Sequence, residues 1–156
     1  MTETTTLLSD YELERGKPMP SKHHAKLQAR LSQALLNAYE QEHDVYSELA
    51  LELDTGKATQ DVAIYPKTSD NWLIDEIRVT NPPLSVMEIL PPTQGLKDLT
   101  DKFAVYFGEV KSYWVLIPNF KTIHIITPDL QVSTFVEGIA KDKATGIELS
   151  VDVIFR

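Results

Sequence analysis

LSVMEIL, at residues 84–90, is a mostly apolar run that ends at two prolines. Short apolar runs bounded by prolines are typical of buried β-strands. Residues 96–107 follow, with Leu99 and Phe103 on one helical stripe. The two segments predict a strand that leads into a helix, as in an α/β fold.

Glu88 is the charged residue of this strand. Alternation of side chains along a strand places it on the same face as Leu84, Val86 and Leu90. Burying a carboxylate among aliphatic side chains is costly unless its charge is compensated. The candidates are a metal ion, a lysine or arginine, or protonation of the glutamate.

The segment upstream of this strand predicts a hairpin. Residues 45–54 (VYSELALELD) lead into the turn-like DTGK at 54–57, and residues 61–65 (DVAIY) form a second short strand. Residues 67–83 are polar, and we expect a loop that can include a short helix near Trp72.

Helical periodicity dominates the amino-terminal part of the chain. Leu27, Leu31 and Leu35 recur at helical spacing and predict an amphipathic helix at residues 22–41, with Ser21 as its cap. A short helical segment is expected at residues 8–14, where a glycine and a proline end it.

The carboxyl-terminal part predicts a meander. Residues 113–117, 122–126 and 132–136 are short apolar runs separated by turn sequences. The final run, GIELSVDVIF at residues 146–155, alternates, and it can form either an edge strand or a docking segment.

A second acid, Asp61, lies at the start of its predicted strand and shares a face with Ala63 and Tyr65. Two carboxylates on neighbouring strands can share one hard cation. Mg²⁺ suits such a pair because it takes a few carboxylate oxygens and keeps water and phosphate in its other positions. A metal held there would polarise a phosphate oxygen and lower the pKa of an attacking water.

Lys102 is the basic partner that we expect for this pair. It lies at the border of the core-facing stripe of the second helix, from which its amine can reach inward. There it can orient or deprotonate water, or stabilise charge on a phosphate. Two structural alternatives stay open: an ion pair with Glu88 without activity, and a surface pair with Asp98 four residues earlier.

Composition bounds the remaining possibilities. The 156 residues are 42% hydrophobic, which fits one domain spanning 1–156. The chain has no cysteine, which excludes disulfides, thiolate zinc sites and a cysteine nucleophile. A net charge of −8 argues against coating nucleic acid through bulk electrostatics, so contacts with DNA are expected to be local. Without an evident signal peptide or membrane span, we expect a soluble, cytoplasmic protein.

Several motifs together resemble a known family. The residues that carry the resemblance are Tyr11-Glu12-Leu13 with Gly16, Pro20, His24, Asp61-Val62-Ala63-Ile64-Tyr65-Pro66, Pro83-Leu84, Glu88-Ile89-Leu90, Pro92-Thr93, Asp98, Lys102, Tyr106, Val110 and Tyr113-Trp114. This set resembles the Uma-two family of bacterial restriction-endonuclease-like proteins, a branch of the PD-(D/E)XK nuclease superfamily. The resemblance spans nearly the whole chain.

The resemblance implies a mixed central β-sheet flanked by helices, with Asp61 and Glu88 as the metal ligands. Position 90 is Leu, so the strand lacks the E-x-K pattern of the superfamily. By resemblance, Lys102 takes the place of the missing lysine.

Weaker candidates lie nearer the amino terminus. Glu12 can be a third acid of the metal site or an exposed glutamate, and His24 can serve a substrate phosphate or be a structural histidine. Lys22, Lys26 and Arg30 form a row that can touch a phosphate backbone or simply form a solvated helix face.

These observations predict a Mg²⁺- or Mn²⁺-dependent endonuclease that hydrolyses phosphodiester bonds in DNA. One alternative is an inactive nuclease-fold module for binding or assembly. Another is an enzyme of the same fold acting on RNA or a small phosphoester. A homodimer is expected because cutting two strands favours two symmetric sites.

Overall fold

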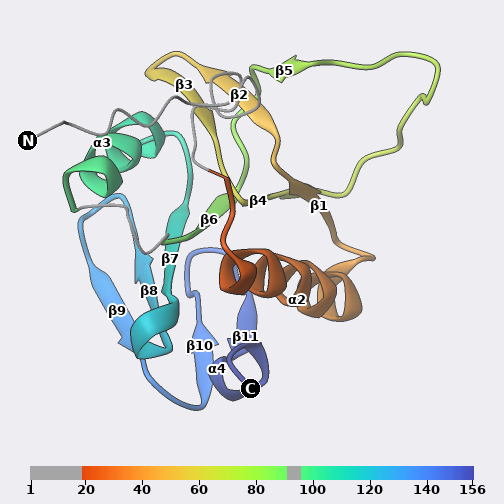
Figure 1. Ribbon diagram of the computed structural model, residues 1–156. Coiled ribbons are helices and arrows are strands. Elements are labelled where there is room, and N and C mark those ends of the chain that lie inside the picture. Colours follow the sequence, from red (N-terminus) through yellow and green to blue (C-terminus); the bar gives the residue numbers. More distant parts are fainter. Residues whose placement is uncertain (1–18, 91–95) are drawn as a thin grey trace, which may run out of the picture.

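The computed structural model describes residues 19–90 and 96–156 (Figure 1). Its centre is a six-stranded sheet with the order β1-β4-β6-β7-β8-β9. The strands are β1 (His43–Ser47), β4 (Val62–Pro66), β6 (Ser85–Ile89), β7 (Ser112–Ile117), β8 (Thr122–Ile126) and β9 (Val132–Phe135). β6 and β7 run parallel, whereas every other neighbouring pair is antiparallel. The predicted mixed sheet is therefore confirmed.

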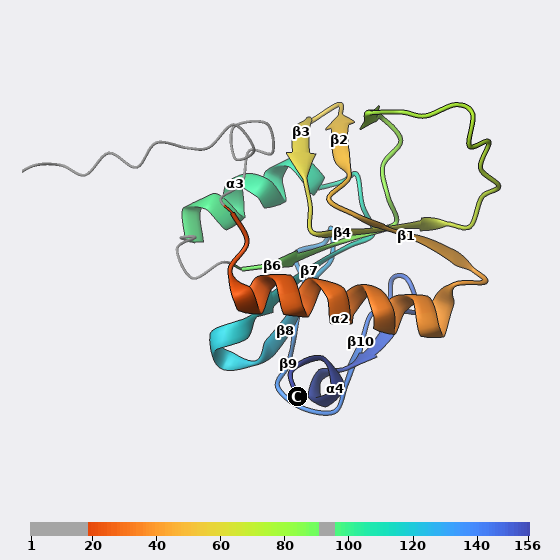
Figure 2. The same ribbon diagram turned by 45° about the vertical axis from the view of Figure 1, so that its right-hand side comes forward.

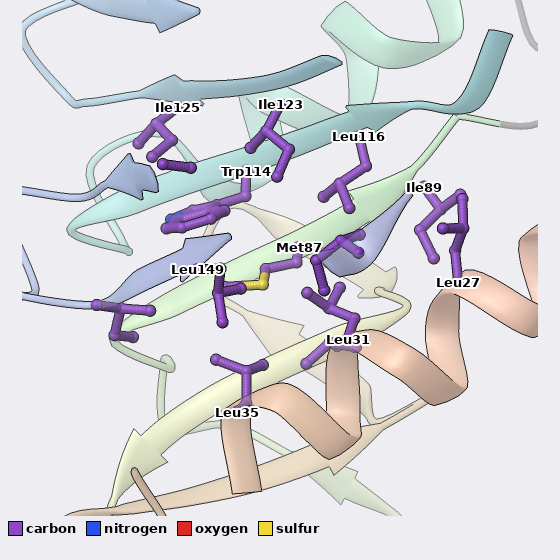
Figure 3. Packing of buried hydrophobic residues seen from close by; sticks show 14 of the residues in the cluster. Leu27, Leu31, Leu35, Met87, Ile89, Trp114, Leu116, Ile123, Ile125 and Leu149 are labelled. Carbon is purple, nitrogen blue, oxygen red and sulfur yellow. The ribbon is translucent and has the colours of Figure 1, made fainter. Parts of the chain in front are cut away.

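Helix α2 (Lys22–Tyr39) covers one face of this sheet (Figure 2). It begins where predicted, because the Ser21 hydroxyl accepts a hydrogen bond from the His24 N–H at 3.2 Å. Its buried stripe of Leu27, Leu31 and Leu35 points toward the sheet (Figure 3). The sheet residues beneath this stripe include Met87, Ile89, Trp114 and Leu116.

Helix α3 (Leu96–Tyr106) packs on the opposite face and makes the crossover that the parallel strands β6 and β7 require (Figure 1). Its buried Tyr106 joins Val86, Tyr113 and Val115 in a second apolar cluster. A small sheet with the order β3-β2-β5 borders this side. Its strands are β2 (Ala50–Leu53), β3 (Gly56–Thr59) and β5 (Arg78–Val79).

The predicted hairpin is divided differently in the structure. Strand β1 pairs with β4, while β2 turns back at Asp54 and Thr55 to pair with β3. Glu48 adopts a positive φ of 56° between β1 and β2, a conformation that interrupts an extended strand. Residues 45–54 are therefore two strands in two sheets.

The prediction of a short helix near Trp72 is wrong. Residues 71–74 form a turn in which the Ile74 N–H donates to the Asn71 carbonyl at 3.0 Å. Trp72 is 91% exposed, so no packing surface stabilises a helix there. The helix expected at residues 8–14 lies outside the described residues.

The meander of β7, β8 and β9 is confirmed, with the 3₁₀ turn η1 (Pro118–Phe120) between its first two strands.

The final run at residues 146–155 forms both a strand and a segment that docks on the core. Residues Glu148–Ser150 form β11, which pairs with the unpredicted β10 (Ile139–Lys141), and α4 (Val151–Ile154) follows. Ile147 and Leu149 are buried in the core beneath α2.

Within the two described ranges, no helix has both the length and the apolar character needed to cross a bilayer.

Candidate active site

Asp61 and Glu88 meet on neighbouring strands. β4 and β6 are antiparallel with Val62 opposite Met87, and continuing this register by one residue places Asp61 opposite Glu88. Residues opposite each other in an antiparallel pair project from the same face of the sheet. Both acids are buried, on the face that α3 covers. The predicted juxtaposition of the two carboxylates is therefore present.

The Asp61 carboxylate is held from two directions. Its Oδ2 accepts a 2.7 Å hydrogen bond from the Ile89 N–H, which ties it to the strand of Glu88. Its Oδ1 lies 3.1 Å from Nε2 of His24. The carboxylate is thus oriented by strand β6 and helix α2.

His24 reaches Asp61 because of its place in α2. It lies in the first turn, three residues before Leu27 and seven before Leu31, on the stripe that faces the sheet. Four residues further along the helix, the Gln28 amide donates to the Asp61 carbonyl and to Oε1 of Glu48, each at 3.1 Å. The start of α2 is therefore fastened to the strand end that carries Asp61.

Glu88 contacts α3. Its Oε2 lies 3.9 Å from Nζ of Lys102, and Oε1 accepts a long hydrogen bond of 3.5 Å from the Tyr106 hydroxyl. Lys102 and Tyr106 are four residues apart and project from the same helix face. In the described part of the chain, no ion pair joins Lys102 to Asp98. Lys102 thus contacts the buried acid.

Tyr106 is suited to act as a permanent donor. Burial, followed by the negative charge of Glu88, raises the pKa of its hydroxyl well above the ordinary value of 10.0. The phenol therefore stays protonated near neutral pH and can donate to the glutamate. Burial also raises the pKa of the neighbouring Tyr113, with Glu88 and Asp61 adding to the effect.

Some of these contacts were not predicted from the sequence. Tyr106 was noted as part of the family pattern but not as a site residue, although its spacing from Lys102 is a usable signal. The Gln28 and Ile89 N–H contacts depend on long-range pairing and leave no local signal. His24, a weaker candidate, contacts Asp61, whereas Glu12 lies outside the described residues.

The donor set determines which cation can fit. Among residues 19–90 and 96–156, no group of three or more His, Cys, Asp or Glu side chains is placed to hold a metal. The two opposed carboxylates offer hard oxygen ligands. Each carboxylate oxygen has more than one lone pair, so it can contact a cation in addition to the groups that already hold it. Mg²⁺ is commonly bound through one or two carboxylates, with water and substrate phosphate completing its shell. The residues present therefore fit this ion.

The mixed β-sheet with a helix on each face makes this an α/β protein of the restriction-endonuclease-like fold. The chain belongs to the Uma-two family (Uma2), whose sequence model carries the description "Putative restriction endonuclease" and matches residues 5–152.

One solved structure has a similar fold. It is titled as the crystal structure of a "putative nuclease belonging to DUF820" from Anabaena variabilis, and it superposes with a TM-score of 0.74. Sequence identity is 18%, and the match covers 88% of this chain and 83% of that chain. No curated protein matches the chain.

Proposed function

We propose that this protein is a metal-dependent endonuclease that hydrolyses phosphodiester bonds in DNA. The observation that carries the proposal is the pair of buried, opposed carboxylates, Asp61 and Glu88, with the Lys102 ammonium 3.9 Å from the glutamate. Membership in a family described as restriction endonucleases supports it.

Asp61 and Glu88 would hold Mg²⁺ or Mn²⁺. When bound, such an ion supplies Lewis acidity toward a phosphate oxygen and toward the attacking water. The protein contributes fixed ligand positions. The Ile89 N–H and His24 hold the carboxylate of Asp61, and Tyr106 and Lys102 hold that of Glu88.

Among the residues around the two acids, Lys102 is the one that would act on the substrate. Its side chain is 25% exposed and its Nζ lies 3.9 Å from Oε2 of Glu88, so Lys102 connects the buried acid with the protein surface. At that position Nζ can orient the attacking water by hydrogen bonding and stabilise the charge that develops on the phosphate. A positive group aimed at developing charge is the main requirement of phosphoryl-transfer chemistry.

Cleavage of supercoiled plasmid in Mg²⁺ or Mn²⁺ tests the proposal. The unsubstituted protein should nick the plasmid, while Asp61→Asn and Glu88→Gln should lose activity. Asp142→Asn changes a third buried acid, in the loop after β10 and away from the two opposed acids, and is the matched control, which should keep activity in its folded fraction. Equal activity in all four proteins would exclude the proposed site, and activity in none would favour the binding or assembly module.

Parallel substrates test the DNA assignment. Single-stranded DNA, RNA and a small phosphodiester should be cut more slowly than duplex DNA. Faster turnover of RNA or the small ester would favour the alternative substrates.

We also propose that the protein acts as a homodimer through the loop between β4 and β5. Trp72, Leu73 and Ile77 are 91%, 95% and 89% exposed, which makes this an unusually apolar surface segment. The same loop carries Asp75 and Glu76, and Arg78 begins the adjoining strand β5. Across a two-fold axis the acids of one copy can face the arginine of the other.

Light scattering after gel filtration tests the dimer. The unsubstituted protein should have the mass of two chains, and Trp72→Ser with Leu73→Ser should have the mass of one. Val136→Ser removes a different exposed apolar side chain and should leave the mass unchanged. A monomeric unsubstituted protein would rule the dimer out.

A further inference from the structure

A basic pocket lies beside the start of α2. A pocket of about 160 Å³ opens between α2, η1 and the residues that follow α4. Its basic lining residues are His23, Lys26, Arg30, Lys121 and Arg156. The rest of the lining is apolar, and no carboxylate side chain contributes to it.

This concentration of positive charge contrasts with the chain as a whole, whose net charge is −8. The ion pairs among the described residues use Lys57, Lys67, Lys102 and His24. Lys26, Arg30 and Lys121 form no ion pair with an acid of the described ranges. Among the described residues, no carboxylate side chain is therefore paired with these charges, and an anion bound among them would reduce their mutual repulsion.

Arg30 is held in place at the pocket wall. Its Nη1 donates to the Ile154 carbonyl at 3.3 Å and to the Arg156 carbonyl. A guanidinium has five N–H donors in a planar fork, so two backbone contacts leave donors for a ligand. Fixing this side chain in advance reduces the entropy lost when an anion binds.

The pocket and the two acids lie at the same edge of the sheet. β6 and β7 are parallel, so the end of β6 at Glu88 and the end of β7 before Pro118 are adjacent. Figure 2 shows the start of α2 and the turn after β7 together at the left-hand edge, where β6 ends. His24 contacts Asp61, and the helical rise places Lys26 and Arg30 about 3 and 9 Å further along the axis.

We propose that this pocket binds a backbone phosphate of the DNA strand whose scissile bond lies at Asp61 and Glu88. The inference rests on the proposed function and names the part of the surface that holds its substrate. Local contacts of this kind explain how an acidic protein binds a polyanion.

The test is a binding measurement that needs no catalysis. Fluorescence anisotropy of a short labelled DNA duplex is recorded with the Asp61→Asn protein in EDTA, over about 50 to 200 mM salt. Lys26→Gln with Lys121→Gln is then added to this background. Lys111→Gln with Lys143→Gln is the control, because both are exposed lysines outside the pocket and form no ion pair with described residues.

Loss of the contact with this phosphate should weaken binding at least about tenfold and reduce the slope of log K against log salt by about 0.9. The control pair should change either quantity far less. Equal effects of the two pairs would overturn the inference, as would the absence of measurable binding before the lysines are changed. Circular dichroism of each variant verifies that its fold is retained.

This outcome is distinguishable from failure of the proposed function. A protein that binds DNA through Lys26 and Lys121 but never cleaves it supports the pocket and contradicts the enzyme. A protein that cleaves DNA with unchanged affinity after both substitutions supports the enzyme and contradicts the pocket.

Discussion

The ends of strands β4 and β6, and the loop after β10 that packs against β7, bury carboxylates to the same degree but surround them differently. Asp61 and Glu88 are 1% and 3% exposed, and Asp142 is 2% exposed. Asp142 accepts from neutral donors: Nε1 of Trp114 at 2.8 Å, the hydroxyl of Ser112, and the Ala144 N–H at 3.0 Å. Asp61 and Glu88 instead contact a histidine and a lysine.

The difference lies in the partners and not in the burial. Neutral donors fix Asp142 and anchor the loop after β10 against β7, so this acid has a structural role. A lysine that is partly open to solvent, such as Lys102, can instead interact with a substrate. Burial of an acid alone therefore does not identify an active site.

The largest effect is expected for Glu88→Gln. The substitution keeps the shape of the side chain but removes a charged oxygen donor that a hard cation requires. Cleavage should fall on the order of 10³-fold or more, while thermal unfolding shows a retained fold. Plasmid cleavage measured beside circular dichroism checks this. Activity within a few fold of the unsubstituted protein would mean that Glu88 resembles Asp142.

A smaller loss of activity is expected for Lys102→Met. Methionine keeps much of the apolar length of the side chain but cannot orient water or stabilise phosphate charge. The cleavage rate should fall about 10²-fold, with Lys102→Arg recovering part of the loss. Single-turnover cleavage, with DNA affinity measured separately, distinguishes chemistry from binding. Unchanged rates would assign Lys102 to a structural ion pair only.

Asp142→Asn should show the opposite pattern. In either orientation its amide NH₂ group would face a donor, either the Ala144 N–H or those of Trp114 and Ser112, which leaves buried polar groups unsatisfied. The free energy of unfolding should decrease by about 2 kcal/mol, measured by urea denaturation. The cleavage rate of the folded fraction should stay within a few fold. A large loss of activity without destabilisation would contradict the structural role.

The smallest effect is expected at Asp44, an acid near the surface. Burial opposes its ionisation, but hydrogen bonds from Thr68 and the nearby Lys67 ammonium outweigh burial and lower the pKa of the carboxyl below 3.8. A lowered pKa stabilises the fold above pH 3.8, and this stabilisation is lost as the pH falls through the folded-state value. Asp44→Asn should therefore flatten the acid side of the stability profile by less than about 1 kcal/mol. Urea denaturation at several pH values checks the effect, and a profile unchanged by the substitution would remove Asp44 from the acid response.

Helix α2, helix α3 and the strands from β6 to β9 were predicted from the sequence, because their signals are local. A stripe such as Leu27, Leu31 and Leu35 needs only helical periodicity, and the strand at 84–90 needs only an apolar run and its prolines. Alternation along that strand also indicated Glu88 as an acid that requires a partner. Charge in an apolar strand is informative because its cost is large.

Tertiary structure decided which strands pair and which partner each buried acid has. The register of β4 against β6 brings Asp61 opposite Glu88, and α2 and α3 bring His24, Lys102 and Tyr106 to them. The sequence marks Asp142 only as an acid, with no sign that Trp114 and Ser112 would hold it. Contacts between residues far apart in the chain depend on the packing of whole elements, and single residues carry no local signal for that packing.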